Sequence, residues 1–228
     1  MRPGYDEPPV HPLPWAVWVI VLPLAAVELW INAGALGLAG GQAGIGWRNL
    51  AAQTLALEPQ MLDQMLATGR FVPDYAMRLL TYALVHGSFT HALLAIVFVL
   101  ALGKFVGEVF SGFAVVAIFL LATISGGVIY SLVPGTTAWL LGAYPGAYGL
   151  IGAFTYILWA RLGQAHANRA RAFSLIGFLL GAQLVFGALL GSKPDWIADL
   201  GGFIAGFAAS ALIAPGAGHR LLRLIRQR

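Results

Sequence analysis

The sequence predicts an all-α integral membrane protein, a single domain with six membrane-spanning helices. Hydrophobic residues make up 59% of the 228 residues and charged residues only 10%, whereas a soluble domain carries about 25% charged residues. Runs of about twenty apolar residues, each long enough to cross a bilayer, recur along the chain. The composition therefore excludes a water-soluble fold. The chain has no cysteine, which excludes disulfides and thiolate metal sites.

The predicted elements follow the hydropathy of the chain. Residues 1–14 are proline-rich and are predicted to form a disordered tail. The membrane domain covers residues 15–213, and residues 214–228 form a basic tail. A long loop, residues 36–77, separates the first two spans; it is glycine-rich at first and then amphipathic. The six spans are predicted at residues 15–35, 79–103, 113–133, 143–160, 173–190 and 196–213.

The basic residues predict the orientation in the membrane. With both termini in the cytoplasm, nine Lys and Arg residues face inward and four face outward, as the positive-inside rule requires. The inner set is Arg2, Lys104, Arg161, Arg169, Arg171, Arg220, Arg223, Arg226 and Arg228. We expect a bacterial cytoplasmic membrane. The basic residues flank apolar spans and leave no domain-sized basic face, which argues against nucleic acid as a partner.

Glycines recur at four-residue spacing, which places small residues on one helix face and allows close approach of two helices in lipid. Such pairs predict a tightly packed bundle but do not distinguish internal packing from dimerisation. They are Gly103/Gly107, Gly142/Gly146, Gly177/Gly181, Gly187/Gly191 and Gly202/Gly206.

Three motifs occur in a fixed order. The stretch RLLTYALVHGSFTHALLAIVFVLALGKFVGEVFSG, from Arg78, contains His86-Gly87-Ser88 with His91, and then Glu108 with Gly112. The segments PGAYGLIGAF and ADLGGFIAG follow in the predicted fourth and sixth spans. Together these motifs resemble those of the rhomboid intramembrane serine proteases. The resemblance covers residues 78–213 and implies a six-transmembrane-helix, rhomboid-like bundle.

The positions that carry catalysis in the family differ in this chain. The resemblance places the nucleophilic serine at Tyr148, the histidine base at Asp199 and an oxyanion-hole asparagine at Ala95. The tryptophan of a W-R pair before the second span is Met77, although Arg78 is kept. Because nucleophile, base and one oxyanion donor are all replaced, the resemblance implies a pseudoprotease without catalytic residues.

The remaining motif residues are interpreted as structural. His86 and His91 hydrogen-bond across helices. They lie about 140° apart around a helix, too far to share a metal with Asp199, so we expect neither a metal nor another cofactor. Arg78 and Glu108 anchor the loop and a helix end, and Gly112 follows that end. The resemblance implies that Tyr148 and Asp199 meet, and we expect a hydrogen bond between them; Gly146 and Gly149, with Gly202 and Gly206, would let their two helices approach closely.

Three functions remain open from the sequence. The first is a non-catalytic adaptor that binds transmembrane helices of another membrane protein or complex, in assembly or quality control. The second is an active intramembrane serine protease that uses another serine, and the third is a small transporter that uses His86, His91 and Asp199. The apolar spans argue against a polar transport path, and the replaced motif positions argue against the protease.

Overall fold

The computed structural model describes residues 12–190 and 194–214. Six long helices dominate the described residues: α1 (Trp15–Ala35), α6 (Phe89–Gly107), α7 (Gly112–Ser131), α8 (Tyr144–Gln164), α9 (Ser174–Leu190) and α10 (Trp196–Ile213). Shorter helices are α2 (Gly41–Gly44), α3 (Trp47–Leu55), α4 (Gln60–Thr68), α5 (Pro73–Thr81), and the 3₁₀ helices η1 (Tyr82–Leu84) and η2 (Arg169–Phe173). The all-α prediction is confirmed for this part of the chain.

Four helices, α1, α6, α7 and α10, are long and apolar enough to cross a membrane by length and composition. The protein is therefore an integral membrane protein. The sequence predicted six spans, and by length and composition only these four qualify among the described residues. α9 has 17 residues, and α8, with 21, contains several glycines, tyrosines and Arg161 and is largely buried in the bundle.

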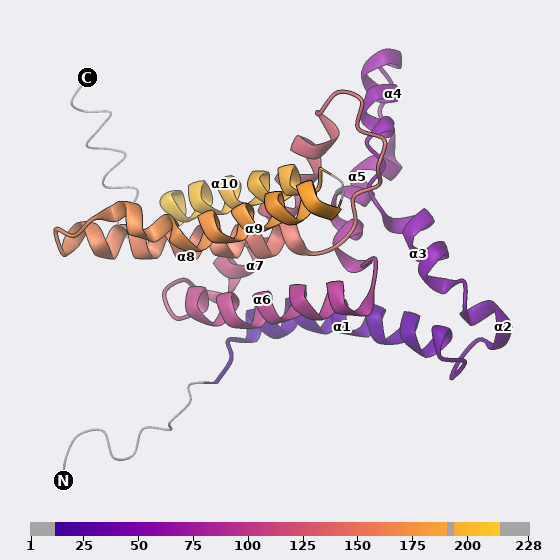
Figure 1. Cartoon of the computed structure of the whole chain (residues 1–228), viewed down its shortest axis with the longest axis horizontal. Coiled ribbons are helices and arrows are strands. Elements are labelled where there is room, and N and C mark those ends of the chain that lie inside the picture. Colours follow the sequence, from indigo (N-terminus) through magenta and orange to yellow (C-terminus); the bar gives the residue numbers. More distant parts are fainter. Residues whose placement is uncertain (1–11, 191–193, 215–228) are drawn as a thin grey trace, which may run out of the picture.

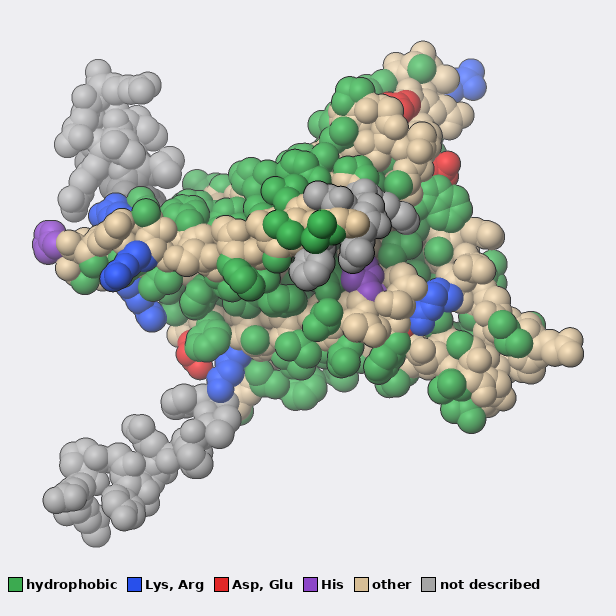
Figure 2. Space-filling view, viewed as in Figure 1, with side chains coloured by type: hydrophobic (Ala, Val, Ile, Leu, Met, Phe, Trp, Pro, Cys, Tyr) green, Lys and Arg blue, Asp and Glu red, His purple; other side chains and the backbone are tan. Residues whose placement is uncertain are grey.

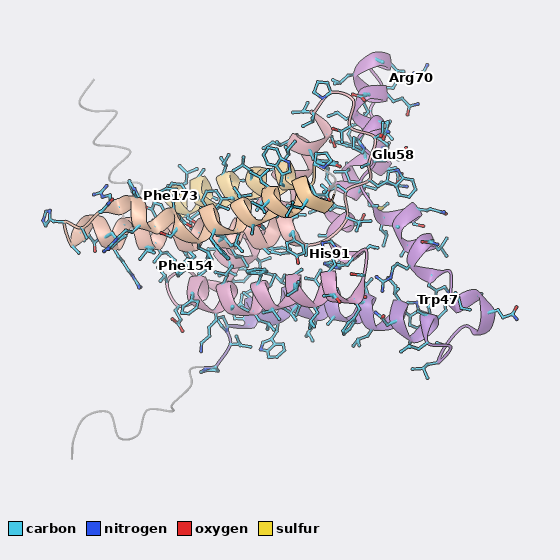
Figure 3. The ribbon with its side chains drawn as sticks, viewed as in Figure 1. Trp47, Glu58, Arg70, His91, Phe154 and Phe173 are labelled. Carbon is cyan, nitrogen blue, oxygen red and sulfur yellow. The ribbon has the colours of Figure 1, made fainter. Side chains whose placement is uncertain are left out.

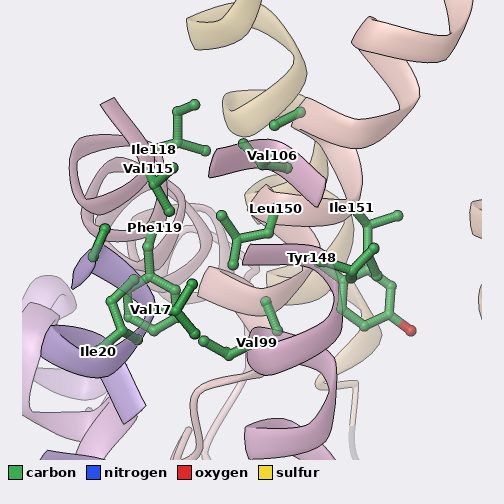
Figure 4. Close-up of a cluster of buried hydrophobic side chains, with 14 of the residues drawn as sticks. Val17, Ile20, Val99, Val106, Val115, Ile118, Phe119, Tyr148, Leu150 and Ile151 are labelled. Atoms are coloured by element: carbon green, nitrogen blue, oxygen red, sulfur yellow. The ribbon is translucent and has the colours of Figure 1, made fainter. Parts of the chain in front are cut away.

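The long helices lie side by side, and the described chain begins and ends at the same end of the bundle (Figure 1). α8 lies at the centre, where it packs against α10, α7 and α6, while α1 packs against α6 and α7. α9 is the least embedded, because its contacts are mainly with η2 and a short stretch of α10. Val17, Val99, Ile118 and Leu150 meet in the apolar core between these helices (Figure 4).

The predicted beginning of the second span, at residue 79, is wrong. Leu79 belongs to α5, η1 follows, and α6 begins only at Phe89. The Ser88 hydroxyl accepts a hydrogen bond of 3.2 Å from the His91 N–H, so Ser88 caps α6. A serine followed by an apolar run is a strong N-cap, because its side chain satisfies an N–H that the helix leaves free. His86 and Ser88 thus precede the helix.

Residues 36–77 are mostly helical, where the sequence predicted a long loop. They contain α2, α3, α4 and the beginning of α5. α3 lies beside the end of α1, where the rings of Trp30 and Trp47 stack with centroids 4.7 Å apart; Figure 3 labels Trp47 there. α4 projects away from the bundle (Figure 1). The amphipathic pattern was therefore the signal of short helices beside the bundle.

The glycine pairs differ in what they pack against. A Cβ atom on Gly206 would clash with the carbonyl oxygen of Gly149, and one on Gly202 with that of Pro145, so this pair forms the α8–α10 crossing. A Cβ on Gly103 would lie 2.9 Å from Val17. A Cβ on Gly177 or Gly181 would meet nothing within 4 Å in the described part of the chain. Gly191 and the surroundings of Gly187 lie outside the described residues.

Candidate functional site

His86 lies in the loop between η1 and α6 and is fully buried. Its Nε2 accepts a hydrogen bond of 3.2 Å from the Ala143 N–H, just before α8. Its carbonyl oxygen accepts one of 2.6 Å from the Arg48 guanidinium. His86 therefore joins three segments that are distant in sequence: the loop before α6, the start of α8, and α3.

His91 lies in the first turn of α6, as Figure 3 shows. Its ring stacks on Tyr144 with centroids 4.8 Å apart and an interplanar angle of 15°, and its Nδ1 accepts a weak hydrogen bond of 3.4 Å from the Gly87 N–H. The rings of His86 and His91 meet edge to face at 5.5 Å. Each ring thus accepts one backbone hydrogen bond and packs against an aromatic neighbour. The buried His86 Nδ1 has no hydrogen-bond partner among the described residues.

A buried ion pair lies beside the loop between η1 and α6 that contains His86, which we call the histidine loop. Glu28 of α1 is 2% exposed, and its carboxylate accepts hydrogen bonds from Arg48 at 2.7 and 3.2 Å and from Asn32 at 2.6 Å. Because Arg48 also reaches the His86 carbonyl, it connects α1, α3 and the loop. Sequence reasoning missed Arg48; the signal was Glu28, since a carboxylate inside an apolar span requires a partner.

Tyr148 and Asp199 are both buried, at 3% exposure, on α8 and α10. They are not hydrogen-bonded to each other, so the predicted direct bond is wrong. Gln183 of α9 lies between them. The Tyr148 hydroxyl donates to Gln183 Oε1 at 3.0 Å, and Gln183 Nε2 donates to Asp199 Oδ2 at 2.7 Å. In Figure 4 the Tyr148 oxygen points away from the apolar cluster beneath its ring. The structure does bring the two positions together, through an amide that no motif identified.

The Tyr148–Gln183–Asp199 bridge leaves Tyr148 without a base to take its proton. Its phenol donates to the oxygen of an amide, a neutral group that does not accept a proton at ordinary pH. Asp199 is one residue further along the chain of hydrogen bonds. A phenol must lose its proton to act as a nucleophile. The two hydrogen bonds join α8, α9 and α10.

Ala95 is fully buried on α6 in the apolar core. Its methyl group cannot donate a hydrogen bond to an oxyanion.

Arg78 donates to Asp74 at 2.8 Å and to the Ala56 carbonyl at 2.9 Å, so it connects α5 to the end of α3. Glu108, the C-cap of α6, is exposed, and its side chain makes no hydrogen bond to the described residues.

The motif glycines are close-packing positions. A Cβ on Gly112 would lie 2.5 Å from the Trp15 ring, and one on Gly146 would lie 2.5 Å from the Phe119 ring. One on Gly149 would clash with Ala122. Each of the three glycines therefore permits a helix contact that any side chain would prevent.

The described serines do not form an alternative dyad. The hydroxyls of Ser131, Ser174 and Ser210 donate to backbone carbonyls, and those of Ser88 and Ser111 accept from N–H groups at helix starts. Among the described residues no serine hydroxyl hydrogen-bonds to a histidine ring. Nor do these residues contain a group of three or more His, Asp or Glu side chains that could hold a metal ion.

Comparison with known families adds one match. The family model described as Rhomboid domain matches residues 73–216, well over half of the chain. The match begins at α5 and includes the histidine loop, Tyr148, Gln183 and Asp199. No curated protein matches the chain.

Proposed function

The chain belongs to the Rhomboid domain family, and on this premise we propose that it is a non-catalytic member that binds transmembrane helices of other membrane proteins. The observation that carries the proposal is the Tyr148–Gln183–Asp199 bridge. By the motif resemblance, Tyr148 and Asp199 stand at the positions of the family's serine and histidine, and in this chain both side chains are hydrogen-bonded to Gln183.

Chemistry supports the loss of proteolysis. Acyl transfer by a serine protease needs a nucleophile beside a base and preorganised donors for the oxyanion. Tyr148 donates to an amide, and Ala95 offers no donor. In a soluble serine protease, loss of the nucleophile or the base alone costs about a million-fold in kcat. Three replacements at one site therefore favour a binding role.

The exposed face of α9 supports a role in helix binding. Gly177 and Gly181 form a small-residue pair that meets no other part of the described chain. Phe178, Val185 and Leu189 beside them are 72, 57 and 74% exposed. Small residues four apart let another helix approach closely in lipid, where packing rather than hydrophobicity drives association. This pair is free to pack with a partner helix, unlike Gly202 and Gly206 in the α8–α10 crossing.

We further propose that α8 and α9 also cross the membrane, giving six spans with both termini in the cytoplasm. Seventeen residues, the length of α9, is the lower limit for a spanning helix, and α8 can be less apolar because its neighbours, not lipid, surround it. Lys104, Arg161, Arg169 and Arg171 lie at the end where the described chain begins and ends. At the opposite end Arg48 and Arg78 are neutralised by Glu28 and Asp74.

Labelling with a fluorophosphonate probe tests the loss of proteolysis. Purified protein in mild detergent should remain unlabelled and should leave transmembrane substrates intact, under conditions in which an active serine protease is labelled to completion. Stoichiometric labelling of one serine would contradict the proposal, and the matching serine-to-alanine variant would identify that residue.

Photo-crosslinking in the native membrane tests helix binding. A crosslinking amino acid at Phe178 on α9 should yield a discrete adduct with another membrane protein. The same amino acid at Phe113 on α7, which is 80% exposed, serves as the matched control. Lipid adducts alone at both positions would rule out a helix partner at α9.

A further inference from the structure

A hollow of about 240 Å³ lies where α8 ends, beside the turn between α6 and α7 and the end of α10. We call it the α8-end pocket. It is lined by Val109 and Phe110 of the turn, by Ala214, and by five residues of α8: Tyr156, Ile157, Ala160, Arg161 and Gln164. The α8 residues recur at one-turn intervals and therefore share one face of the helix. The pocket is remote from the Tyr148–Gln183–Asp199 bridge, at the other end of α8.

The polar side chains of this pocket have no hydrogen-bond or ion-pair partner among the described residues, and those of Arg161 and Gln164 are exposed and available to a ligand. The Arg161 guanidinium makes no hydrogen bond or ion pair with any described residue, and neither does the Gln164 amide. The Tyr156 hydroxyl also lacks a hydrogen-bond partner in the described chain, although most of the Tyr156 ring is buried. A guanidinium, an amide and a phenol, all hydrogen-bond donors, thus border the pocket. Of these the guanidinium is best suited to bind a phosphate, because it can donate two parallel hydrogen bonds.

The surrounding charge favours an anion. Lys104, Arg161, Arg169 and Arg171 lie at this end of the bundle, where Figure 2 shows blue side chains gathered over the ends of the helices. Glu108, the C-cap of α6, is an acidic residue at the turn between α6 and α7. Arg169 is already engaged, with its guanidinium 4.6 Å from the centre of the Trp159 ring. Arg161 is therefore the cation that this pocket offers to a ligand.

The other walls of the pocket are apolar. Phe110 and Ile157 are buried core residues, and the pocket lies beside the ends of α6 and α10, which are long and apolar enough to span a membrane. A free phosphate ion would leave these walls in water. A phospholipid would place its phosphate on Arg161 and its acyl chains along the neighbouring spans, as in basic pockets between transmembrane helices that bind anionic headgroups.

We propose that the α8-end pocket binds the headgroup of an anionic phospholipid, with Arg161 as the phosphate ligand and Tyr156 and Gln164 as further donors. The site would hold one lipid at a fixed position on the helix bundle. The assignment depends on the pocket itself and is independent of whether the chain hydrolyses peptides or binds another helix.

Native mass spectrometry of the detergent-solubilised full chain tests this, with dioleoylphosphatidylglycerol and dioleoylphosphatidylcholine as probes. Wild-type protein should retain one phosphatidylglycerol in preference to phosphatidylcholine. Arg161→Gln should weaken that retention about tenfold, the factor that corresponds to about 1.4 kcal/mol of binding free energy. Arg171→Gln removes the same charge at the same end of the bundle but outside the pocket, and should retain the lipid as wild type does.

One further variant and one competition experiment complete the test. Ala160→Trp should reduce retention by filling the pocket, of which Ala160 is part, without changing the charge. Inorganic phosphate in millimolar excess should not displace the lipid. Equal retention by wild type and Arg161→Gln, equal loss in Arg171→Gln, or full displacement by inorganic phosphate would each overturn the proposal. Unfolding temperatures measured in parallel show that each variant is folded.

Discussion

Gln183 donates a hydrogen bond of 2.7 Å to the carboxylate of Asp199, although the two residues lie on different helices, α9 and α10. The same amide accepts the Tyr148 hydroxyl of α8 at 3.0 Å. One side chain therefore satisfies two buried polar groups that would otherwise face an apolar interior. α9 has few other contacts with the bundle, so this amide is its main polar attachment.

Replacing Gln183 with Leu should destabilise the protein more than replacing Tyr148 with Phe. Gln183→Leu leaves both the phenol and the carboxylate unsatisfied, at about 1–3 kcal/mol for each buried group. Tyr148→Phe leaves only one amide oxygen without a donor, and hydrogen bonds within membranes average about 0.6 kcal/mol. Unfolding temperatures in detergent would measure the difference. Gln53→Leu, at an exposed position of α3, is the matched control; equal destabilisation by all three would contradict the bridging role.

Asp199→Asn should be tolerated better than Asp199→Ala. Asparagine keeps an oxygen that can accept from Gln183, whereas alanine leaves the amide without an acceptor and opens a cavity. Comparison of the two unfolding midpoints measures the effect. The interpretation of Asp199 as a structural acceptor would be untenable if alanine were the better tolerated substitution.

Removal of Arg48 should be among the more harmful changes at the end of α1. Arg48→Ala leaves the Glu28 carboxylate buried without a cation and takes a donor from the His86 carbonyl. Breaking a fully buried pair costs about 3–5 kcal/mol, and we expect about half of that because Arg48 is 24% exposed. The double variant Glu28→Gln with Arg48→Gln should recover much of the loss, because no charge is then left alone. No recovery in the double variant would show that the pair itself is unimportant.

Gly206 and Gly177 should respond oppositely to leucine. Gly206→Leu should prevent correct folding, because even a Cβ at that position meets the backbone of Gly149. Gly177→Leu should leave the unfolding temperature unchanged, since nothing lies within 4 Å, but should abolish the crosslink from Phe178 to a partner. Size-exclusion profiles and crosslinking yields measure the two effects. An intact crosslink in Gly177→Leu would place the partner elsewhere.

Restoring serine at Tyr148 and histidine at Asp199 should not restore proteolysis. The oxyanion hole still lacks a donor, because Ala95 is a buried methyl group, and removing one such donor costs about 10²–10³ in kcat. Adding Ala95→Asn to the pair is the informative control. Substrate cleavage by the double variant at the rate of the triple variant would show that Ala95 is not limiting.

The sequence alone determined the properties that depend on local composition. Runs of apolar residues identified α1, α7 and α10 almost to the residue, because crossing a bilayer requires a continuous hydrophobic segment whatever its neighbours are. The ordered motifs indicated the family, and the family match agrees. The amphipathic stretch in residues 36–77 was visible, but its folding into α3 and α4 was not, since short helices depend on tertiary packing for stability.

Only the tertiary structure decided which polar residues meet. Gln183 carries no motif and lies in an apolar helix, yet it connects Tyr148 and Asp199, and Arg48 reaches Glu28 from twenty residues away in the chain. The glycine pairs look alike in sequence, but Gly202 and Gly206 meet a neighbouring backbone whereas Gly177 and Gly181 meet none of the residues that the structure describes. These differences arise from the relative position of whole helices, and side-chain spacing within one helix carries no information about the helix that will face it.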